Sequence, residues 1–433
     1  MYYRRITPLL QDALGDTPVV LVNGARQTGK TTLVTQLVPA LARPTPMSGG
    51  ASHANADPAS GRTYLSLDDS GLQAAARADP TGFIAGITGP VIIDEVHHAP
   101  ELFPAIKLSV DRDRRPGRFL LTGSANVMLL PRLSESLAGR MEILTLWPLA
   151  QVEIEGAQSS VVDLLFSSDN PAGPLHAVAR EDLIRRLLAG GYPEAMGRKS
   201  EARRRAWFTS YVTTILQRDV RDIADIEGLS QLPSLLSLLA SRTASLLNLS
   251  SVSSAVGIPY ATLNRYMALL KATFLVQELP AWSSNLGKRL TKAPKLLIND
   301  TGLVSSLLGL DARRLVNEAA IFGQLLETLV AMEFKKAASW SEICPSLFHF
   351  RTQDRLEVDL LLESAAGMVV GIEVKASSTV SPSDFNGLRA LAEMTGDCFV
   401  RGIVLYTGDQ VIPFGEHLHA IPLSFLWTNG RNE

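Results

Sequence analysis

The residues most able to do chemistry lie near the N-terminus, in a glycine-rich segment that also carries a lysine and a hydroxyl. Residues 24–31 read Gly-Ala-Arg-Gln-Thr-Gly-Lys-Thr and match G-x-x-x-x-G-K-[ST] at every position. The glycines let main-chain N–H groups face a phosphate, and a helix predicted to begin near Lys30 adds a favourable dipole. Lys30 would reach the β- and γ-phosphates, and the Thr31 hydroxyl would bind Mg²⁺. The predicted nucleotide contacts are Gly24, Ala25, Arg26, Gln27, Thr28, Gly29, Lys30, Thr31 and Thr32.

A short acidic motif follows at residues 91–95, Val-Ile-Ile-Asp-Glu. Its apolar run predicts a buried strand that brings Asp94 to the Mg²⁺ side of the phosphates. Glu95, one residue further on, would polarise the attacking water. Taken by itself, the motif would also fit a buried strand that ends in solvated carboxylates.

A third apolar run ends in small hydroxyl residues. Thr122 and Ser124 would lie at the carboxyl end of a central strand, where they could sense the γ-phosphate or orient water. An ordinary strand-to-turn boundary is the alternative. His97 and His98 follow the acidic motif and are expected to be solvated loop histidines rather than metal ligands.

Positioning these groups requires a parallel sheet covered by helices. Between residues 18 and 126, short β-rich runs alternate with helical stretches, which is the pattern of such a sheet. Arg43–Arg62 is rich in Pro, Gly, Ser and Ala, and predicts a flexible surface insertion. The expected strands are Pro18–Asn23, Thr63–Leu67, Pro90–Ile93, Arg118–Thr122 and Met141–Leu146.

The rest of the chain changes character twice. Ser159–Pro174 is polar and is expected to be a linker. Apolar residues at three- and four-residue spacing then predict helices over Glu181–Leu188, Glu201–Ile226 and Leu232–Leu247. The predicted fold class is therefore α/β with a helical middle region. From residue 347 the expected elements are strands Leu347–Thr352, Glu357–Glu363, Met368–Lys375 and Gly402–Tyr406, with a helix near Ser383–Glu393.

Composition bounds the remaining possibilities. The 433 residues suggest roughly two to four domains, and 46% hydrophobic residues suit an ordinary globular protein. A net charge of −2 argues against whole-surface binding to nucleic acid, so any such binding must be local. Cys344 and Cys398 are too few for a disulfide framework. No stretch is apolar for long enough to cross a membrane, so we expect a cytoplasmic protein.

Together these motifs resemble the AAA+ ATPases, and more closely the prokaryotic group in which an ATPase core precedes a C-terminal domain of unknown function. The resemblance implies ATP and Mg²⁺ as ligands. It also makes Arg140, just before the last core strand, a candidate arginine finger for a neighbouring subunit, with a plain surface arginine as the alternative. Such a finger implies a homo-oligomer, with a hexameric ring among the options. Arg185 and Arg186 are candidate lid arginines. The segments that carry the resemblance are 24–31, 64–69, 93–95 with 99–100, 121–124, 137–140, 190–194, 295–296 and 300–303.

A helix-turn-helix spacing occurs in the middle region. Residues 249–266 predict a helix, a glycine turn and a second helix, and a hairpin is expected to begin at Phe274. The second helix offers Asn264 and Arg265 but little else to read bases, so sequence-specific regulation is not expected. The alternative is a lid or scaffold whose lysines are solvated or salt-bridged. A basic cluster that could contact DNA phosphates follows, at Lys288, Arg289, Lys292 and Lys295.

Acidic residues also interrupt apolar strands near the C-terminus. Asp359 lies in one such strand, and period-two geometry places Glu373 and Lys375 on one face of the next. With Glu327 on the preceding helix, this order resembles the PD-(D/E)XK nuclease-like fold, in which acids hold Mg²⁺ and a lysine activates water. The residue before Asp359 is Val358 rather than Pro, and many members keep the fold without cleavage. A salt-bridged pair in a structural domain is the alternative.

The sequence thus predicts four domains and leaves three functions open. The first function is an ATPase that binds or remodels DNA, such as branched or broken DNA. The second is an ATP-driven switch that acts on protein partners through a catalytically silent C-terminal module. The third is an ATP-licensed, Mg²⁺-dependent nuclease. The predicted domains are the ATPase core 1–158, a helical lid or connector 175–247, a winged-helix-like region 248–300 and a nuclease-like domain 301–433.

Overall fold

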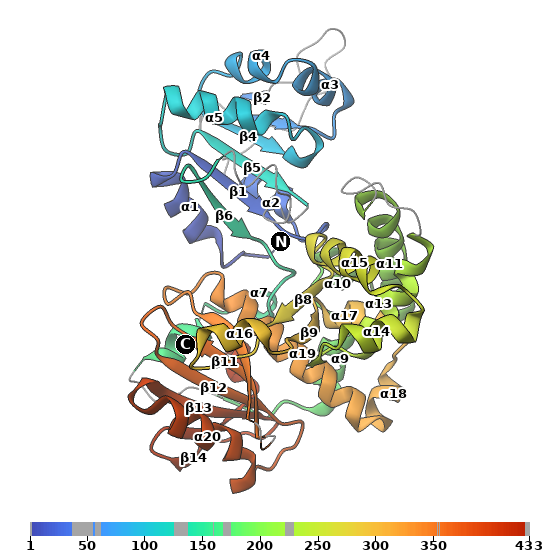
Figure 1. Ribbon diagram of the computed structural model, residues 1–433, viewed down its shortest axis with the longest axis vertical. Helices are drawn as coiled ribbons and strands as arrows, with labels where there is room; N and C mark the ends of the chain where they lie inside the picture. Colours follow the sequence, from blue (N-terminus) through green and yellow to red (C-terminus); the bar gives the residue numbers. More distant parts are fainter. Residues whose placement is uncertain are drawn as a thin grey trace. The chain divides into compact units, whose positions relative to one another are not determined.

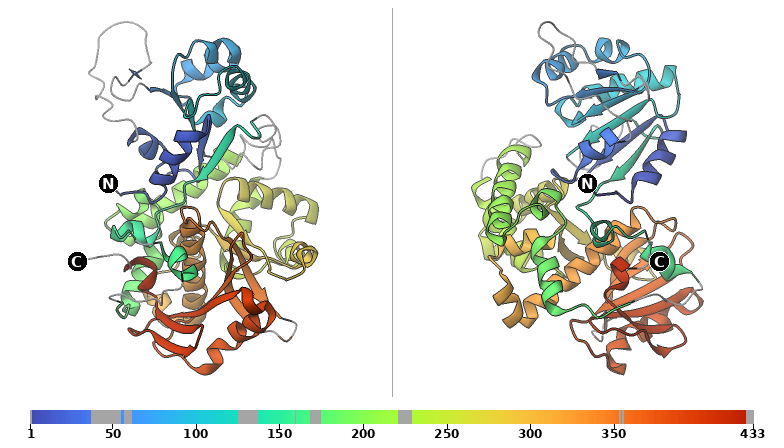
Figure 2. Two further views of the ribbon diagram at one scale, coloured as in Figure 1. Left: turned by 90° about the vertical axis from the view of Figure 1, so that its left-hand side faces the viewer. Right: turned by 180° about the vertical axis from the view of Figure 1, so that it is seen from behind.

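The chain forms two compact units in the computed structural model (Figures 1 and 2). The N-terminal unit comprises Arg4–Trp147 with Lys271–Phe274, and the C-terminal unit comprises Met1–Tyr3, Pro148–Leu270 and Leu275–Glu433. The four-domain division expected from the sequence stays a prediction. The structure describes residues 2–36, 55–56, 62–124, 137–158, 160–167, 175–220, 229–352, 354 and 356–428.

A single sheet organises the N-terminal unit. Every neighbouring pair of its strands is parallel except β2–β3, which is antiparallel. This arrangement confirms the predicted parallel sheet. The strand order is β2 (Asn55–Ala56), β3 (Thr63–Ser66), β4 (Val91–Asp94), β5 (Phe119–Gly123), β1 (Val19–Asn23) and β6 (Met141–Thr145).

Helices cover both faces of this sheet, because alternate residues of each strand point to opposite sides. Val20 and Val22 of β1 pack with Leu33 of α2 (Lys30–Gln36) in one core cluster. Val19 and Leu21 point to the other face and pack with the apolar side of α5 (Leu102–Arg112) in a second cluster. One face therefore carries α1 (Thr7–Asp16) and α2 (Lys30–Gln36), and the other carries α3 (Ser70–Ala78), α4 (Pro80–Ala85) and α5 (Leu102–Arg112).

The C-terminal unit begins with helices. Residues Ile215–Asp219 continue α11 (Glu201–Thr214) as a π-helical turn, and the last six positions of the helix predicted over Glu201–Ile226 lie outside the described residues. The helices in this part are α7 (Gln151–Glu155), α8 (Val161–Phe166), α9 (Arg180–Ala189), α10 (Pro193–Met196), α11 (Glu201–Thr214) and α13 (Leu232–Ser241).

The segment predicted to be a linker, Ser159–Pro174, contains helix α8, so that prediction is wrong for its first half. The Ser160 hydroxyl accepts a hydrogen bond from the Asp163 N–H and caps the helix. Val162 and Leu165 are fully buried, so apolar packing holds a segment whose overall composition is polar. Residues 168–174 lie outside the described residues.

A small antiparallel sheet with two helices follows. Helix α13 ends at Ser241 rather than Leu247, because Ser245 and Leu246 pair with β9 as strand β7. The expected hairpin at Phe274 is a wider connection, in which α16 (Leu286–Thr291) separates two paired strands. The sheet order is β7 (Ser245–Leu246), β9 (Lys295–Ile298) and β8 (Val276–Leu279), and the helices are α14 (Leu249–Val256) and α15 (Tyr260–Ala272).

A second six-stranded sheet completes the chain (Figure 1, orange to red). Its helix α20 (Asn386–Thr395) packs on β11, β12 and β13, with Leu388 and Leu391 in the core. The long helix α19 (Ala319–Ala338) precedes the sheet, after α17 (Thr301–Leu307) and α18 (Ala312–Asn317), and α21 (Phe425–Thr428) follows it. The order is β10 (Ser346–Arg351), β11 (Glu357–Glu363), β12 (Val369–Val374), β13 (Phe399–Tyr406), β15 (Leu418–Pro422) and β14 (Ile412–Gly415).

Candidate functional site

The glycine-rich loop joins β1 to α2 and has a main-chain path that its first glycine makes possible. Gly24 has φ +150°, and a Cβ built there would lie 2.2 Å from the carbonyl oxygen of Leu146. Gly29 has φ +94°, and Gln27 is also left-handed at φ 62°. The loop therefore curls tightly against the end of β6, and residue types at two of its positions are dictated by the backbone.

We expect Gly24→Ala to lower the stability of the chain by about 1–3 kcal/mol, because the new methyl group overlaps a main-chain oxygen. Gly139→Ala is the matched control, since Gly139 has φ +71° but nothing within 4 Å of its added Cβ. Thermal melting measures both. Equal melting temperatures for the two variants would contradict the close approach at Gly24.

Lys30 is buried within the loop that precedes it. Its side chain is 4% exposed, and Nζ donates hydrogen bonds of 3.0 Å to the carbonyl oxygens of Gly24 and Ala25. Thr28 also donates to the Ala25 carbonyl, at 2.9 Å. The ammonium is thus held at the mouth of the loop, where the main-chain N–H groups of a helix start converge.

Asp94, at the end of β4, accepts hydrogen bonds from three hydroxyl groups. The hydroxyls of Thr31 and Tyr64 donate to Oδ2 at 2.9 and 2.8 Å. The Thr122 hydroxyl donates to Oδ1. Burial and the Asp94 charge together raise the pKa of Tyr64 above its ordinary value, so Tyr64 stays a neutral donor. The carboxylate is therefore oriented from both sides, with the Thr31 hydroxyl beside it.

Glu95 has an unusual backbone conformation for a residue with a side chain. Its φ is +55° and ψ +47°, and its N–H donates to the Thr122 hydroxyl at 2.9 Å. Its carboxylate lies 3.1 Å from Nδ1 of His97. Burial alone would raise the pKa of Glu95, but pairing with His97 and the charges of Lys30 and Arg26 lower it to about 2. Glu95 is therefore an ionised, largely buried carboxylate beside Lys30.

The two histidines are partly buried, so the expectation that they are solvated is wrong. Their side chains are 13% and 11% exposed. Nε2 of His97 lies 3.3 Å from the Ser124 hydroxyl, and His98 lies 3.4 Å from Asp68. His97 therefore contacts both Glu95 and Ser124, which follow the neighbouring strands β4 and β5.

Two further residues contact this site without having been assigned a role from sequence. The Arg4 guanidinium donates to the carbonyl oxygens of Thr28 and Trp147, each at 2.7 Å, and so ties the loop to the end of the unit. Tyr64 contacts Asp94 as described above. No sequence spacing links Arg4 to the loop, whereas Tyr64 lies on the strand next to β4 and register could have suggested it.

Each of the three arginines expected to act on nucleotide forms an ion pair with an acidic residue. Arg140 donates to Asp111 and to the Ala138 carbonyl, with 29% of its side chain exposed. Arg186 pairs with Asp182 and Glu155 and stacks on the ring of Trp427. Arg185 pairs with Asp182 and is 73% exposed. Arg186 is thus committed within the C-terminal unit, while Arg140 and Arg185 remain on the surface.

The basic cluster expected to contact DNA is divided by the structure. Lys295 is 3% exposed and is surrounded by carboxylates, so its assignment as a DNA contact is wrong. Arg289 is paired with Glu363 and lies over the rings of Trp282 and Phe348. Lys292 is exposed. The side chain of Lys288 lies outside the described residues.

The four nuclease-like residues do converge in the C-terminal unit. Lys375 lies 3.0 Å from Glu373, and Asp359 accepts a hydrogen bond from the Val374 N–H at 3.0 Å. Burial, with the charge of Asp359, raises the pKa of Glu373 to about 8 and that of Glu327 to about 7. Convergence alone does not establish cleavage, and no group of three or more acidic, histidine or cysteine residues in the described chain could hold a metal ion.

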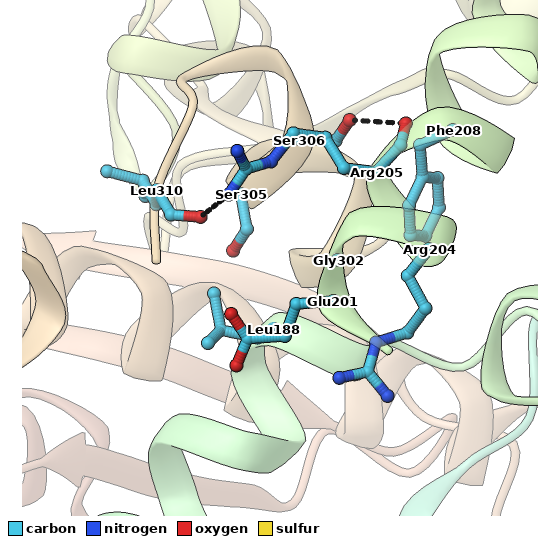
Figure 3. Close-up of a pocket in the computed structure, with 9 residues that line it drawn as sticks. All are labelled: Leu188, Glu201, Arg204, Arg205, Phe208, Gly302, Ser305, Ser306 and Leu310. Carbon is cyan, nitrogen blue, oxygen red and sulfur yellow. Dashed lines mark hydrogen bonds between the residues drawn. The ribbon is translucent and has the colours of Figure 1, made fainter. Parts of the chain in front are cut away.

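A pocket in the helical part of the C-terminal unit is too small for a substrate. It lies between α9, α11 and α17 (Figure 3) and encloses about 20 Å³, room for little more than one water molecule. Arg205, one of its lining residues, donates to the Leu310 carbonyl at 3.3 Å.

No helix among the described residues is both long and apolar enough to span a bilayer.

Comparison with known families defines the class of the N-terminal unit. Residues 16–155 match the family model of an AAA domain. Residues 180–314 and 322–426 match two domains of unknown function, DUF8612 and DUF4143. The loop, the sheet and this match together identify an AAA-type ATP-binding domain, followed by a DUF4143 domain.

Two curated relatives cover almost the whole chain. They are Uncharacterized protein Rv2008c of Mycobacterium tuberculosis (strain ATCC 25618 / H37Rv) and Uncharacterized protein Mb2031c of Mycobacterium bovis (strain ATCC BAA-935 / AF2122/97). Each is 30% identical over 428 residues, which span 97% of this chain and 83% of the relative. The chain belongs to the family of these two mycobacterial proteins.

Solved structures add no functional argument. The chain matches a STAND ATPase with a tetratricopeptide repeat sensor from Pyrococcus horikoshii at 11% identity and TM-score 0.18, covering 75% of this chain and 47% of that one. It matches the structure of Drosophila ORC bound to DNA at 14% identity and TM-score 0.20, covering 70% of this chain and 85% of that one. Scores this low carry no weight for fold or function.

Proposed function

We propose that this protein hydrolyses ATP at the loop of residues 24–31, with Mg²⁺. The observation that carries the proposal is the convergence of Lys30, Thr31, Asp94 and Glu95 at the carboxyl edge of one parallel sheet. Triphosphates are bound at such an edge because helix N-terminal N–H groups and a lysine neutralise them together.

The chain's own groups divide the work. Thr31 and Asp94 would hold Mg²⁺, since their oxygens lie 2.9 Å apart and the remaining ligands in such sites come from phosphate and water. When bound, Mg²⁺ neutralises phosphate charge. Glu95 orients and deprotonates the attacking water. Thr122 fixes Asp94 and the Glu95 main chain, and Ser124 positions His97 against Glu95.

Arg140 supports an oligomeric form of this enzyme. Its partner Asp111 is 41% exposed, so the pair sits at the surface and can open at modest cost. An arginine freed in this way could approach the γ-phosphate of a neighbouring copy and stabilise transition-state charge. A homo-oligomer, with a hexameric ring as one form, follows from this role.

We further propose that ATP hydrolysis is coupled to DNA through helix α15 and its neighbouring sheet. Helices α14 and α15 with the strands β7, β9 and β8 support this proposal, because they supply the helix pair and the small sheet that a winged-helix-like region would need. Tyr260, Asn264 and Arg265 are exposed on α15. A groove of about 870 Å³ in the same unit is lined by Lys292 and Arg351, along with Asp354. The exposed residues Arg265 and Lys292 replace the buried Lys295 as the candidate DNA contacts.

The test is ATPase turnover with and without single-stranded, duplex and branched DNA. The mass of the protein in the presence of ATP is measured alongside, to give its oligomeric state. DNA is expected to stimulate turnover, and the double variant Arg265→Ala, Lys292→Ala should lose most of the stimulation. Two lost phosphate contacts should also reduce the salt slope of DNA binding by about 2. Arg203→Ala, an exposed arginine on α11, is the matched control.

If DNA leaves turnover unchanged, the second function gains support, an ATP-driven switch acting on protein partners with a silent C-terminal module. A monomeric mass in ATP would remove the role proposed for Arg140. Mg²⁺-dependent DNA cleavage that is lost in Lys375→Ala would instead support the third function, an ATP-licensed nuclease.

A further inference from the structure

Lys295 occupies the centre of the acidic cluster in the C-terminal unit. It begins strand β9 of the three-stranded sheet, yet its side chain is 3% exposed. Nζ lies 2.6 Å from Glu327, 2.8 Å from Glu357 and 3.2 Å from Asp359. These carboxylates come from α19 and β11, so one ammonium contacts acids from two other elements.

The residues present do not fit Mg²⁺ at this place. Mg²⁺ needs about six oxygens at roughly 2.0–2.1 Å in octahedral geometry. Here Glu327 and Asp359, two of the acids that a nuclease-like site would use, already face an ammonium at 2.6 and 3.2 Å. A third acid, Glu373, is paired with Lys375 at 3.0 Å. The ammonium fills the space that the metal would need.

We infer that Lys295 is the resident cation of this cluster, in place of a divalent metal. The cluster is then a buried ion-pair network that fastens β9 to α19 and β11, and it does not support metal-dependent hydrolysis. The inference concerns the C-terminal unit alone and does not depend on the ATPase proposal.

The charge state of Lys295 agrees with this assignment. Burial lowers the pKa of Lys295, but the charges of Asp359, Glu327 and Glu357 outweigh it and raise the pKa above its ordinary value. Lys295 is therefore a permanent cation. A second ammonium, that of Lys375, lies 3.0 Å from Glu373, so both lysines pair with acids of the cluster.

Geometry also explains why a lysine suits this position. An ammonium has three donors, and three carboxylate oxygens lie within 3.2 Å of it. The apolar stem of Lys295 follows a strand whose other residues, Leu296, Leu297 and Ile298, are buried. A buried ion pair of this kind costs desolvation energy and is retained when its hydrogen bonds are all satisfied.

The test is a titration of the nucleotide-free full chain with Mn²⁺, in which electron paramagnetic resonance measures the Mn²⁺ that remains free. Wild-type protein is expected to bind no Mn²⁺ at this cluster, so Asp359→Asn should leave its titration unchanged. Lys295→Met keeps the apolar stem and removes the charge, and should gain one Mn²⁺ site. Adding Glu327→Gln to that variant should remove the new site. Lys199→Met, at an exposed position, is the matched control and should bind as wild type does.

Two results would overturn the inference. One is a Mn²⁺ site in wild-type protein that Asp359→Asn abolishes, because the cluster would then hold metal with Lys295 present. The other is a folded Lys295→Met variant that gains no Mn²⁺ site. If Lys295→Met does not fold, as judged by circular dichroism, the comparison of wild type with Asp359→Asn decides the matter by itself.

Discussion

Lys30→Ala is expected to abolish ATP binding while leaving the chain folded. The Lys30 ammonium is the cation at the mouth of the loop, held by the carbonyl oxygens of Gly24 and Ala25. With a triphosphate it would exchange these bonds for charge-assisted bonds to phosphate, each worth roughly 1.5–3 kcal/mol. Loss of two such bonds weakens affinity by at least about a hundredfold. Titration with a fluorescent ATP analogue in Mg²⁺ measures the change.

Stability must be measured on the same samples, since Lys30 also bonds to its own loop. Removing these bonds should cost about 1 kcal/mol, far less than global unfolding requires. Lys199→Ala serves as the control, because Lys199 is exposed and lies in the other unit. A folded Lys30→Ala protein with wild-type ATP affinity would remove the loop of residues 24–31 from nucleotide binding.

Local rules made the N-terminal unit predictable. In the glycine-rich loop, residue type and backbone conformation are coupled at Gly24 and Gly29, so the motif specifies its own geometry. The strands β1, β4 and β5 are continuous apolar runs because they are buried on both faces, as Val19–Asn23 is. The parallel sheet followed from these two signals, and the AAA domain followed from the resemblance of the combined motifs to that family.

Contacts made only in three dimensions were harder to predict. Arg4 donates to the Thr28 carbonyl only because the fold brings the two residues together, and their spacing in the sequence does not predict the contact. His97 was expected to be solvated, because it follows Glu95 closely in a predicted loop, yet it contacts both Glu95 and Ser124. In both cases tertiary packing decided the outcome.

Lys295 illustrates the same limit for charge. Four basic residues close in sequence suggest an exposed patch, since lysines are seldom buried. The acids that neutralise Lys295 lie 32 and 64 positions further along the chain, at Glu327 and Asp359. Both carboxylates were identified from sequence as part of a possible metal site, whereas Lys295, which neutralises them, was assigned to DNA contact. The sequence signal for their pairing was that Lys295 is a charged residue at the start of an apolar strand.

Glu95→Gln should separate binding from chemistry. Glutamine keeps the size and hydrogen-bonding reach of the side chain but cannot accept the proton of the attacking water. ATP affinity is therefore expected to stay within a few-fold of wild type, while turnover falls by about 10²–10⁴-fold. A bound triphosphate adds negative charge beside Glu95 and raises its pKa from about 2, which makes the carboxylate a better base when it is needed.

The low pKa gives this variant an independent signature in stability. Glu95 has a folded-state pKa of about 2, below its ordinary value of 4.5, so its ionised form contributes stability above pH 4.5. That contribution is lost as pH falls from 4.5 towards 2, and Glu95→Gln lacks it throughout. The stability difference between wild type and variant should thus shrink over this range in urea unfolding experiments. Undiminished turnover would remove Glu95 as the base, whereas a pH-independent stability difference would show only that its carboxylate is not held in the low-pKa environment formed by His97 and Lys30.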